Sequence, residues 1–152
     1  MNMGHKLSVV IASVNGLPII RECLESLRQQ PKSEELEVIV VHRCTDGVSE
    51  VIRRDYPWVT LIDAPAATTI PELRALAVRE SSGEVVAVLE DHCLVTKDWA
   101  RQMIEAHQGE YDVIGGSVEN AACERFVDWA AFFCEYYQAM EPILAGKAKI
   151  IP

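Results

Sequence analysis

The sequence predicts an α/β fold with a mostly parallel sheet flanked by helices. Short apolar runs rich in valine and isoleucine alternate along the chain with segments whose apolar residues recur at helical spacing. Continuous apolar runs are typical of strands buried on both faces, and regular strand–helix alternation is typical of parallel sheets covered by helices. A length of 152 residues fits one domain, which we expect to span residues 1–152.

Five apolar runs mark the strands, and turn-forming residues separate them from the helices. The first run is followed by Gly16 and Pro18, the second by Thr45–Gly47, and the fifth is interrupted by Gly115–Gly116. Glycine and proline at such points favour turns. The predicted strands are Leu7–Ala12, Leu36–Val41, Val59–Ile62, Glu84–Leu89 and Tyr111–Val118.

Helices are predicted where apolar residues return every three or four positions. Pro31 and Pro57 end the first two, Pro71 suits the first position of the third, and Gly83 looks like the stop signal of that third helix. Thr96 or Asp98 could cap the fourth. The predicted helices are Leu17–Gln30, a segment from Val48 to Pro57, a segment from Pro71 to Gly83, a segment around Trp99–Ile104, and Phe126–Ile143.

Composition excludes several classes of function. The formal net charge of −9 argues against a non-specific nucleic-acid binder, which needs a basic face. No run approaches the roughly 20 apolar residues of a membrane-spanning helix. Five widely spaced cysteines, an odd number without a Cys-x-x-Cys pair, indicate reduced thiols. We therefore expect a cytoplasmic protein, with peripheral membrane contact as a lesser alternative.

Polar residues follow three of the predicted strands. They are Ser13–Asn15, His42–Asp46 and Glu90–Cys93. Because ligands of open α/β sheets lie beyond the carboxyl ends of the strands, these segments form the candidate site. Two carboxylates and an imidazole at 90–92 suit Mn²⁺ or another divalent metal, although the acids could equally cap the next helix or be solvated.

Glycine-rich phosphate loops are missing. No G-x-G-x-x-G follows the first strand, and no G-x-x-x-x-G-K-[ST] is present. The sequence therefore excludes a dinucleotide dehydrogenase and a P-loop NTPase.

Five landmarks in order resemble the N-terminal, donor-binding part of family 2 glycosyltransferases, which have a GT-A fold. Leu7–Asn15 is similar to the family's S-V-V-I-P-S-Y-N opening, Cys23–Gln30 to C-L-x-S-L-x-x-Q, and Glu37–Gly47 to E-V-I-V-V-D-D-G-S-T-D-G. Arg74 takes the place of the arginine in A-R-N-x-G, and Gly83–His92 resembles the strand ending in the D-x-D metal motif. Trp99 also falls where the family often has tryptophan.

The resemblance implies a site for a nucleotide-diphosphate sugar and a bound Mn²⁺ or Mg²⁺. By this likeness Ala12 and Val14 would shape the base pocket, and Arg74 could approach the diphosphate. Glu90 and Asp91 would face the ribose and the metal, and His92 would take the principal metal position. The metal would act as a Lewis acid on the departing diphosphate.

Three departures from the family pattern fall at this predicted site. His42–Arg43 replaces the acidic pair after the second strand, so Arg43 could favour another base or pair with a phosphate. Val14 replaces a tyrosine, and His92 replaces an acid, so metal binding should weaken below about pH 6.5. They indicate altered donor choice or a relative that has lost catalysis.

The resemblance also implies a missing part. Family members continue for about another hundred residues with the acceptor site, so we expect the general base beyond Pro152 and an inactive isolated chain. The aromatic segment 126–143 would pack on that absent part and otherwise favour a homo-oligomer.

Two functions of different classes remain open. The first is a glycosyltransferase domain that transfers sugar from a nucleotide donor to an unknown acceptor hydroxyl. The second is a non-catalytic nucleotide-sugar-binding or interaction module on the same scaffold. A flavodoxin-like receiver fits the alternation but needs carboxylates after the first strand.

Overall fold

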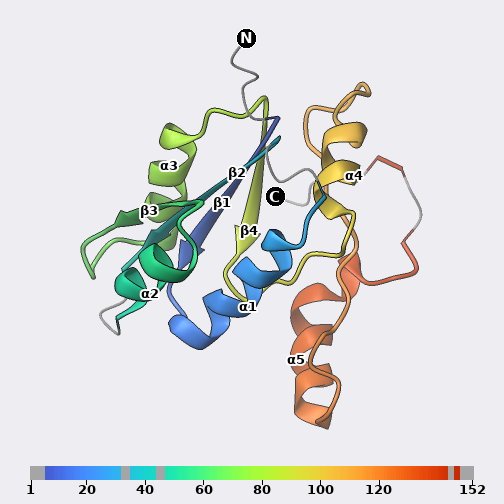
Figure 1. The fold of residues 1–152 in the computed structure, drawn as a ribbon. Coiled ribbons are helices and arrows are strands. Elements are labelled where there is room, and N and C mark those ends of the chain that lie inside the picture. Colours follow the sequence, from blue (N-terminus) through green and yellow to red (C-terminus); the bar gives the residue numbers. More distant parts are fainter. Residues whose placement is uncertain (1–5, 32–34, 44–46, 144–145, 148–152) are drawn as a thin grey trace. The chain divides into compact units, whose positions relative to one another are not determined.

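Four parallel strands form one sheet in the order β3-β2-β1-β4 (Figure 1). The computed structural model describes residues 6–31, 35–43, 47–143 and 146–147. The strands are β1 (Leu7–Ser13), β2 (Leu36–His42), β3 (Val59–Asp63) and β4 (Val85–Glu90). All carboxyl ends of these parallel strands lie at one edge of the sheet.

Helices cover both faces of this sheet. The helices α1 (Leu17–Arg28), α2 (Val48–Asp55) and α4 (Trp99–Ala106) pack against one face, whose core includes Val9 and Ile11 of β1. The helix α3 (Ile70–Glu80) packs against the other face, where Leu73 and Ala77 meet the intervening β1 residues (Figure 1). Alternate residues of a strand point to opposite faces, so the apolar run of β1 serves both cores. The predicted parallel sheet flanked by helices is confirmed.

Local sequence explains where the first and third helices begin. Gly16, with φ of 85°, precedes α1 in a backbone conformation that side chains disfavour. Thr69 and Glu72 form a capping box at the start of α3, in which the Thr69 N–H donates to the Glu72 carboxylate at 2.8 Å. Both starts follow directly from residue types visible in the sequence.

The order of the strands reverses between β1 and β4. The connections through α1 and α2 carry the chain from β1 to β2 and on to β3. The connection through α3 then returns across the sheet to place β4 on the free side of β1. Such a reversal separates the loops after two neighbouring strands and is where open α/β sheets bind ligands.

Two predicted elements are wrong in kind or length. Residues 111–118 form no strand; Val118 makes only an isolated bridge with Met140, and Val113 is 84% exposed. The predicted helix over 126–143 is shorter: α5 (Phe126–Tyr136) passes into a 3₁₀ turn, η2 (Tyr137–Ala139). Pro142 lacks the N–H that a continuing helix needs and restricts the residue before it.

Gly83 does not end α3, contrary to the sequence interpretation. The helix ends at Glu80, and Ser81 follows with extended backbone. A Cβ at Gly83 would lie 2.6 Å from Ser8 Oγ and 2.7 Å from Ser8 N. The absence of a side chain therefore lets the turn before β4 pack on β1.

The chain forms two compact units, residues 1–112 and 113–152. The first contains the whole sheet and both apolar cores, and the second contains α5. One domain over residues 1–152 stays a prediction. Within the described ranges, no helix combines the length and apolarity needed to cross a bilayer.

Candidate functional site at the carboxyl edge of the sheet

Asp91 joins the loops on the two sides of the strand reversal. It directly follows β4 and is 1% exposed. Its Oδ2 accepts hydrogen bonds from the backbone N–H of Val14 at 2.8 Å and of Asn15 at 3.0 Å. Its Oδ1 accepts a bond from Asn15 Nδ2 at 2.6 Å. The carboxylate is thus held by the loop after β1.

Glu90 and His92 flank Asp91 and differ from it in exposure. Glu90, the last residue of β4, forms an ion pair with Arg74 of α3, and both side chains are partly exposed. His92 is about half-exposed, with Nδ1 3.6 Å from Asp91 Oδ1. The structure thus brings the predicted residues Arg74, Glu90, Asp91 and His92 to one region of the edge.

Ala12 and Val14 lie beside this region but differ in accessibility. Ala12 is 2% exposed and belongs to the core under α3. Val14 is partly buried and packs against that same core. Of these two predicted base-pocket residues, Val14 therefore offers the more accessible side chain.

The residues after β2 form a second polar group. His42 is 3% exposed, and its Nε2 lies 2.7 Å from Asp63 Oδ1 and 2.8 Å from Ser49 Oγ. Hydrogen bonds from Ser49 and then from Arg53 hold the pKa of the Asp63 carboxyl well below its usual range. Because Ser49 and Asp63 meet the same ring nitrogen, the group cannot work as a Ser-His-Asp relay, which uses both nitrogens.

Arg43 points its guanidinium at the loop before α3. Its Nη1 donates a hydrogen bond to the Thr68 carbonyl at 2.6 Å. The predicted role of Arg43 toward a base or phosphate stays a prediction, and it would require this bond to be shared or released. Cys44 and Asp46 lie outside the described residues.

A divalent metal suits the chemistry of the 90–92 triplet but not its arrangement. Oxygen and imidazole donors fit Mn²⁺. However, three N–H groups occupy the buried Asp91 carboxylate, and Arg74 pairs with Glu90. Among the described residues no group of three His, Cys, Asp or Glu side chains could hold a metal ion. The side chains as placed therefore do not form a cation site by themselves.

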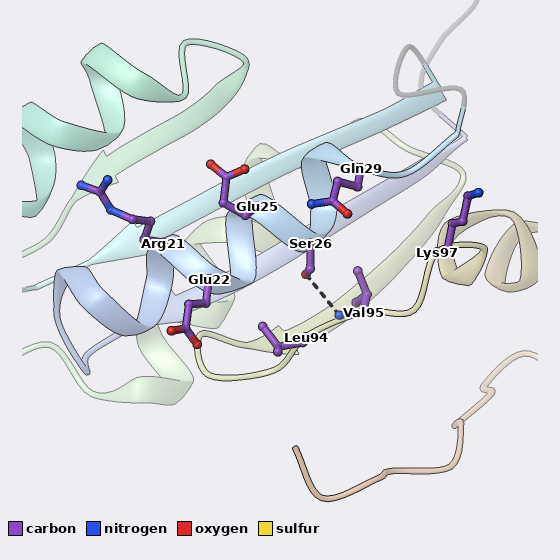
Figure 2. Close-up of a pocket in the computed structure, with 8 residues that line it drawn as sticks. All are labelled: Arg21, Glu22, Glu25, Ser26, Gln29, Leu94, Val95 and Lys97. Carbon is purple, nitrogen blue, oxygen red and sulfur yellow. Dashed lines mark hydrogen bonds between the residues drawn. The ribbon is translucent and has the colours of Figure 1, made fainter. Parts of the chain in front are cut away.

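A surface groove lies away from these residues. It has a volume of about 760 Å³ and runs between the outer side of α1 and the loop after β4 (Figure 2). A hydrogen bond connects its two sides: Ser26 Oγ accepts the Val95 N–H at 3.1 Å (Figure 2). The lining residues are Arg21, Glu22, Glu25, Ser26, Gln29, Leu94, Val95 and Lys97. None of them is a predicted site residue.

The sequence placed Asn15 in a candidate segment without identifying its partner, and it did not single out Asp63. Asn15 is exposed and Asp63 ends β3, and each contacts a residue that the sequence did single out. Their position just after or at the end of a strand was the available signal.

Comparison with known proteins places the chain in a family. The chain is 27% identical over 146 residues to the uncharacterized glycosyltransferase YfnE of Bacillus subtilis, covering 90% of this chain and 33% of YfnE. Among solved structures, a mannosyltransferase from Pyrobaculum calidifontis in complex with GDP-Man and Mn²⁺ superposes with a TM-score of 0.60 at 24% identity. That match covers 75% of this chain and 35% of the mannosyltransferase.

A second solved structure agrees in fold. S. aureus TarS in complex with UDP-GlcNAc has a TM-score of 0.53 and 24% identity, covering 68% of this chain and 30% of the TarS chain. The chain thus spans about a third of the length of these relatives. Residues 8–146 match the family described as glycosyl transferase family 2, and the chain belongs to this family with its GT-A fold.

Proposed function

We propose that this chain is the donor-binding part of a glycosyltransferase. It would bind a nucleotide-diphosphate sugar at the carboxyl edge of β1, β2 and β4, and the whole protein would transfer the sugar to an acceptor hydroxyl. The observation that supports this most is the convergence of Arg74, Glu90 and His92 beside the strand reversal. Similar folds bind GDP-Man and UDP-GlcNAc.

Arg74 is the residue we assign to the diphosphate. A guanidinium can donate several hydrogen bonds to phosphate oxygens and offset their charge. Arg74 is partly exposed and paired with Glu90, so a bound diphosphate would compete with this carboxylate. Glu90 would then be released toward the ribose hydroxyls, which a carboxylate can accept hydrogen bonds from.

The base would lie between the loops after β1 and β2. Val14 would contribute an apolar contact, with the Ala12 methyl group beneath it in the core. Arg43 would leave the Thr68 carbonyl to face the base or a phosphate. Because a guanidinium only donates hydrogen bonds, it favours a base that presents acceptors.

The transfer step needs groups beyond those described above. Deprotonation of an acceptor hydroxyl requires a general base within hydrogen-bond reach. None of the residues described above is assigned this role, and we expect the isolated chain to bind donor without turning it over. Because the 90–92 side chains do not assemble a cation site, no step of this proposal uses a metal.

Calorimetric titration of the 152-residue chain with UDP, GDP and dTDP, each with and without Mn²⁺, tests the proposal. We expect one nucleotide to bind and Arg74→Ala to weaken that binding by about tenfold or more, since hydrogen bonds to charged groups contribute about 1.5–3 kcal/mol. Arg79→Ala is the matched control, because Arg79 is an exposed arginine of the same helix.

Failure of all three nucleotides to bind the folded chain would reject the donor-binding proposal. It would support the second candidate, a non-catalytic interaction module. The hydrogen bond from Arg43 to the Thr68 carbonyl favours that candidate. A guanidinium that bonds the backbone in this way is less available to a phosphate of the donor.

A further inference from the structure

We infer that Asp91 is a positioning residue that fixes the loop after β1 at the strand reversal, and that it is not a metal ligand. The inference rests on the proposed function only for its consequence in nucleotide binding. It assigns Asp91 and Asn15 a shared role that residue types alone do not reveal. We call the set of hydrogen bonds between them the 15–91 clamp.

Both carboxylate oxygens of Asp91 accept hydrogen bonds in the clamp. Oδ2 accepts the N–H groups of two successive residues, Val14 and Asn15, and Oδ1 accepts the Asn15 side-chain amide. All three distances lie between 2.6 and 3.0 Å. Hydrogen bonds to an ionised carboxylate are about twice as strong as neutral ones. The loop is therefore held in backbone and in side chain at once.

Burial makes this arrangement incompatible with a ligand role. Asp91 is 1% exposed, so a cation reaching its carboxylate would have to displace N–H donors from a site closed to water. Each donor left buried without a partner would cost free energy. His92 and Glu90, which are both more exposed than Asp91, lie on either side of it in the chain. The buried middle position therefore supports the loop while its neighbours face outward.

The clamp also spans the two halves of the proposed site. Asn15 precedes Gly16 and α1 on the base side, whereas Asp91 follows β4, whose last residue pairs with Arg74 on the diphosphate side. Seventy-six residues of sequence separate the two partners. Positioning of this kind lowers the cost of ordering both loops when a ligand binds.

Substitutions that move the carboxylate distinguish a positioning role of Asp91 from a role as a metal ligand. Asp91→Asn keeps the shape, and rotation of the Asn15 amide lets the new amide donate to its oxygen. Asn15→Asp alone places two carboxylates together. The double variant Asn15→Asp/Asp91→Asn restores one carboxylate and one amide with their positions exchanged. We call this double variant the exchanged pair. Asp98→Asn, in the same loop region, is the matched control because the Asp98 side chain makes no capping bond.

Two readouts in the 152-residue chain test the clamp. The first is ligand-free: the thermal midpoint, with the NMR shifts of the Val14 and Asn15 amide protons. We expect Asp91→Ala and Asn15→Asp to lower the midpoint and move both amide signals upfield, and the exchanged pair to recover most of each loss. Failure of the exchanged pair to recover either would overturn the inference.

The second readout is affinity for the nucleotide that the wild-type chain binds, with and without Mn²⁺. A positioning role predicts that the exchanged pair binds within a few-fold of wild type while Asn15→Asp binds about tenfold or more weakly. Loss of Mn²⁺-dependent binding in a folded exchanged pair would instead identify Asp91 as a ligand and overturn the inference. If the wild type binds no nucleotide, the proposed function fails, and the ligand-free readout still decides the clamp.

Discussion

Cys23 lies on the buried face of α1, next to Glu90 at the end of β4. Its thiol is fully buried and lies 3.8 Å from the Glu90 carbonyl oxygen. Burial, followed by the nearby charges of Cys93 and Asp91, raises the pKa of Cys23 from 9.0 to about 12. The folded chain therefore resists formation of this thiolate, and Cys23 is a poor nucleophile despite its position near the site.

The raised pKa of Cys23 makes the free energy of unfolding depend on pH in the alkaline range. The pKa of Cys23 is higher in the folded chain than in the unfolded chain. The contribution of this thiol to the free energy of unfolding is therefore complete below about pH 9 and is lost as pH rises toward 12. The wild-type free energy of unfolding should fall in that interval by up to about 1.4 kcal/mol per pH unit more than that of Cys23→Ala. Urea unfolding between pH 8 and 10.5 measures the two slopes. Parallel slopes would contradict the assignment, and Cys134→Ala, at an exposed cysteine, should behave as wild type.

For single residues, the sequence predicted positions better than it predicted hydrogen-bond partners. Arg74, Glu90, Asp91 and His92 were predicted to share a site because each follows a strand or occupies a family motif, and they do lie together. That Asp91 turns inward to Asn15 while Glu90 reaches α3 depends on the pleat of β4 and the register of β1 with β4. Residue spacing alone does not encode that choice.

The turn between α3 and β4 is an element whose packing depends on one missing side chain. Gly83 donates its N–H to Ser8 Oγ at 2.8 Å, and Ser82 bonds the Glu37 carboxylate. These contacts join β1, β2 and the start of β4 at the amino edge of the sheet. A methyl group at position 83 would meet the Ser8 backbone nitrogen at 2.7 Å.

Gly83→Ala should therefore lower the free energy of unfolding by about 1–3 kcal/mol, the usual cost of overpacking. The methyl group forces backbone apart, because part of the clash is with main-chain atoms that cannot rotate away. Chemical denaturation measures the loss. Gly109→Ala is the control, since its nearest atom would be 3.4 Å away. Equal stability of the two variants would show that the turn is free to shift.

The elements themselves were predictable where burial was continuous. The run Leu7–Ser13 is buried at every position, and strand periodicity is not needed to recognise it. The segment 111–118 has similar residue types but was wrongly predicted as a strand, because strand formation also requires a neighbour to pair with. Only Val118 finds one among the described residues, and Gly115–Gly116 adds no side chain to bury.

For the molecule as a whole, the two compact units differ in how much apolar surface they bury. Both apolar cores consist entirely of residues before position 105. Among the described residues of the second unit, Phe132 is the only buried hydrophobic residue, whereas Phe126 and Phe133 of α5 are 90% and 46% exposed. An exposed set of aromatic side chains on α5 favours association with another apolar surface.

Residues 1–112 expressed alone should fold, because they retain strands β1–β4 and the helices α1–α4 that pack on them. We expect a cooperative thermal transition within a few degrees of that of the 152-residue chain, and a single monomeric species in sedimentation velocity. The 152-residue chain is the matched control, and its sedimentation coefficient should rise with concentration, since it carries the exposed α5 aromatics. A fragment without a cooperative transition would show that residues 113–152 complete the core of the first unit. A fragment that associates as strongly as the full chain would show instead that the associating surface lies on the first unit, where Val86 and Val88 of the edge strand β4 are exposed.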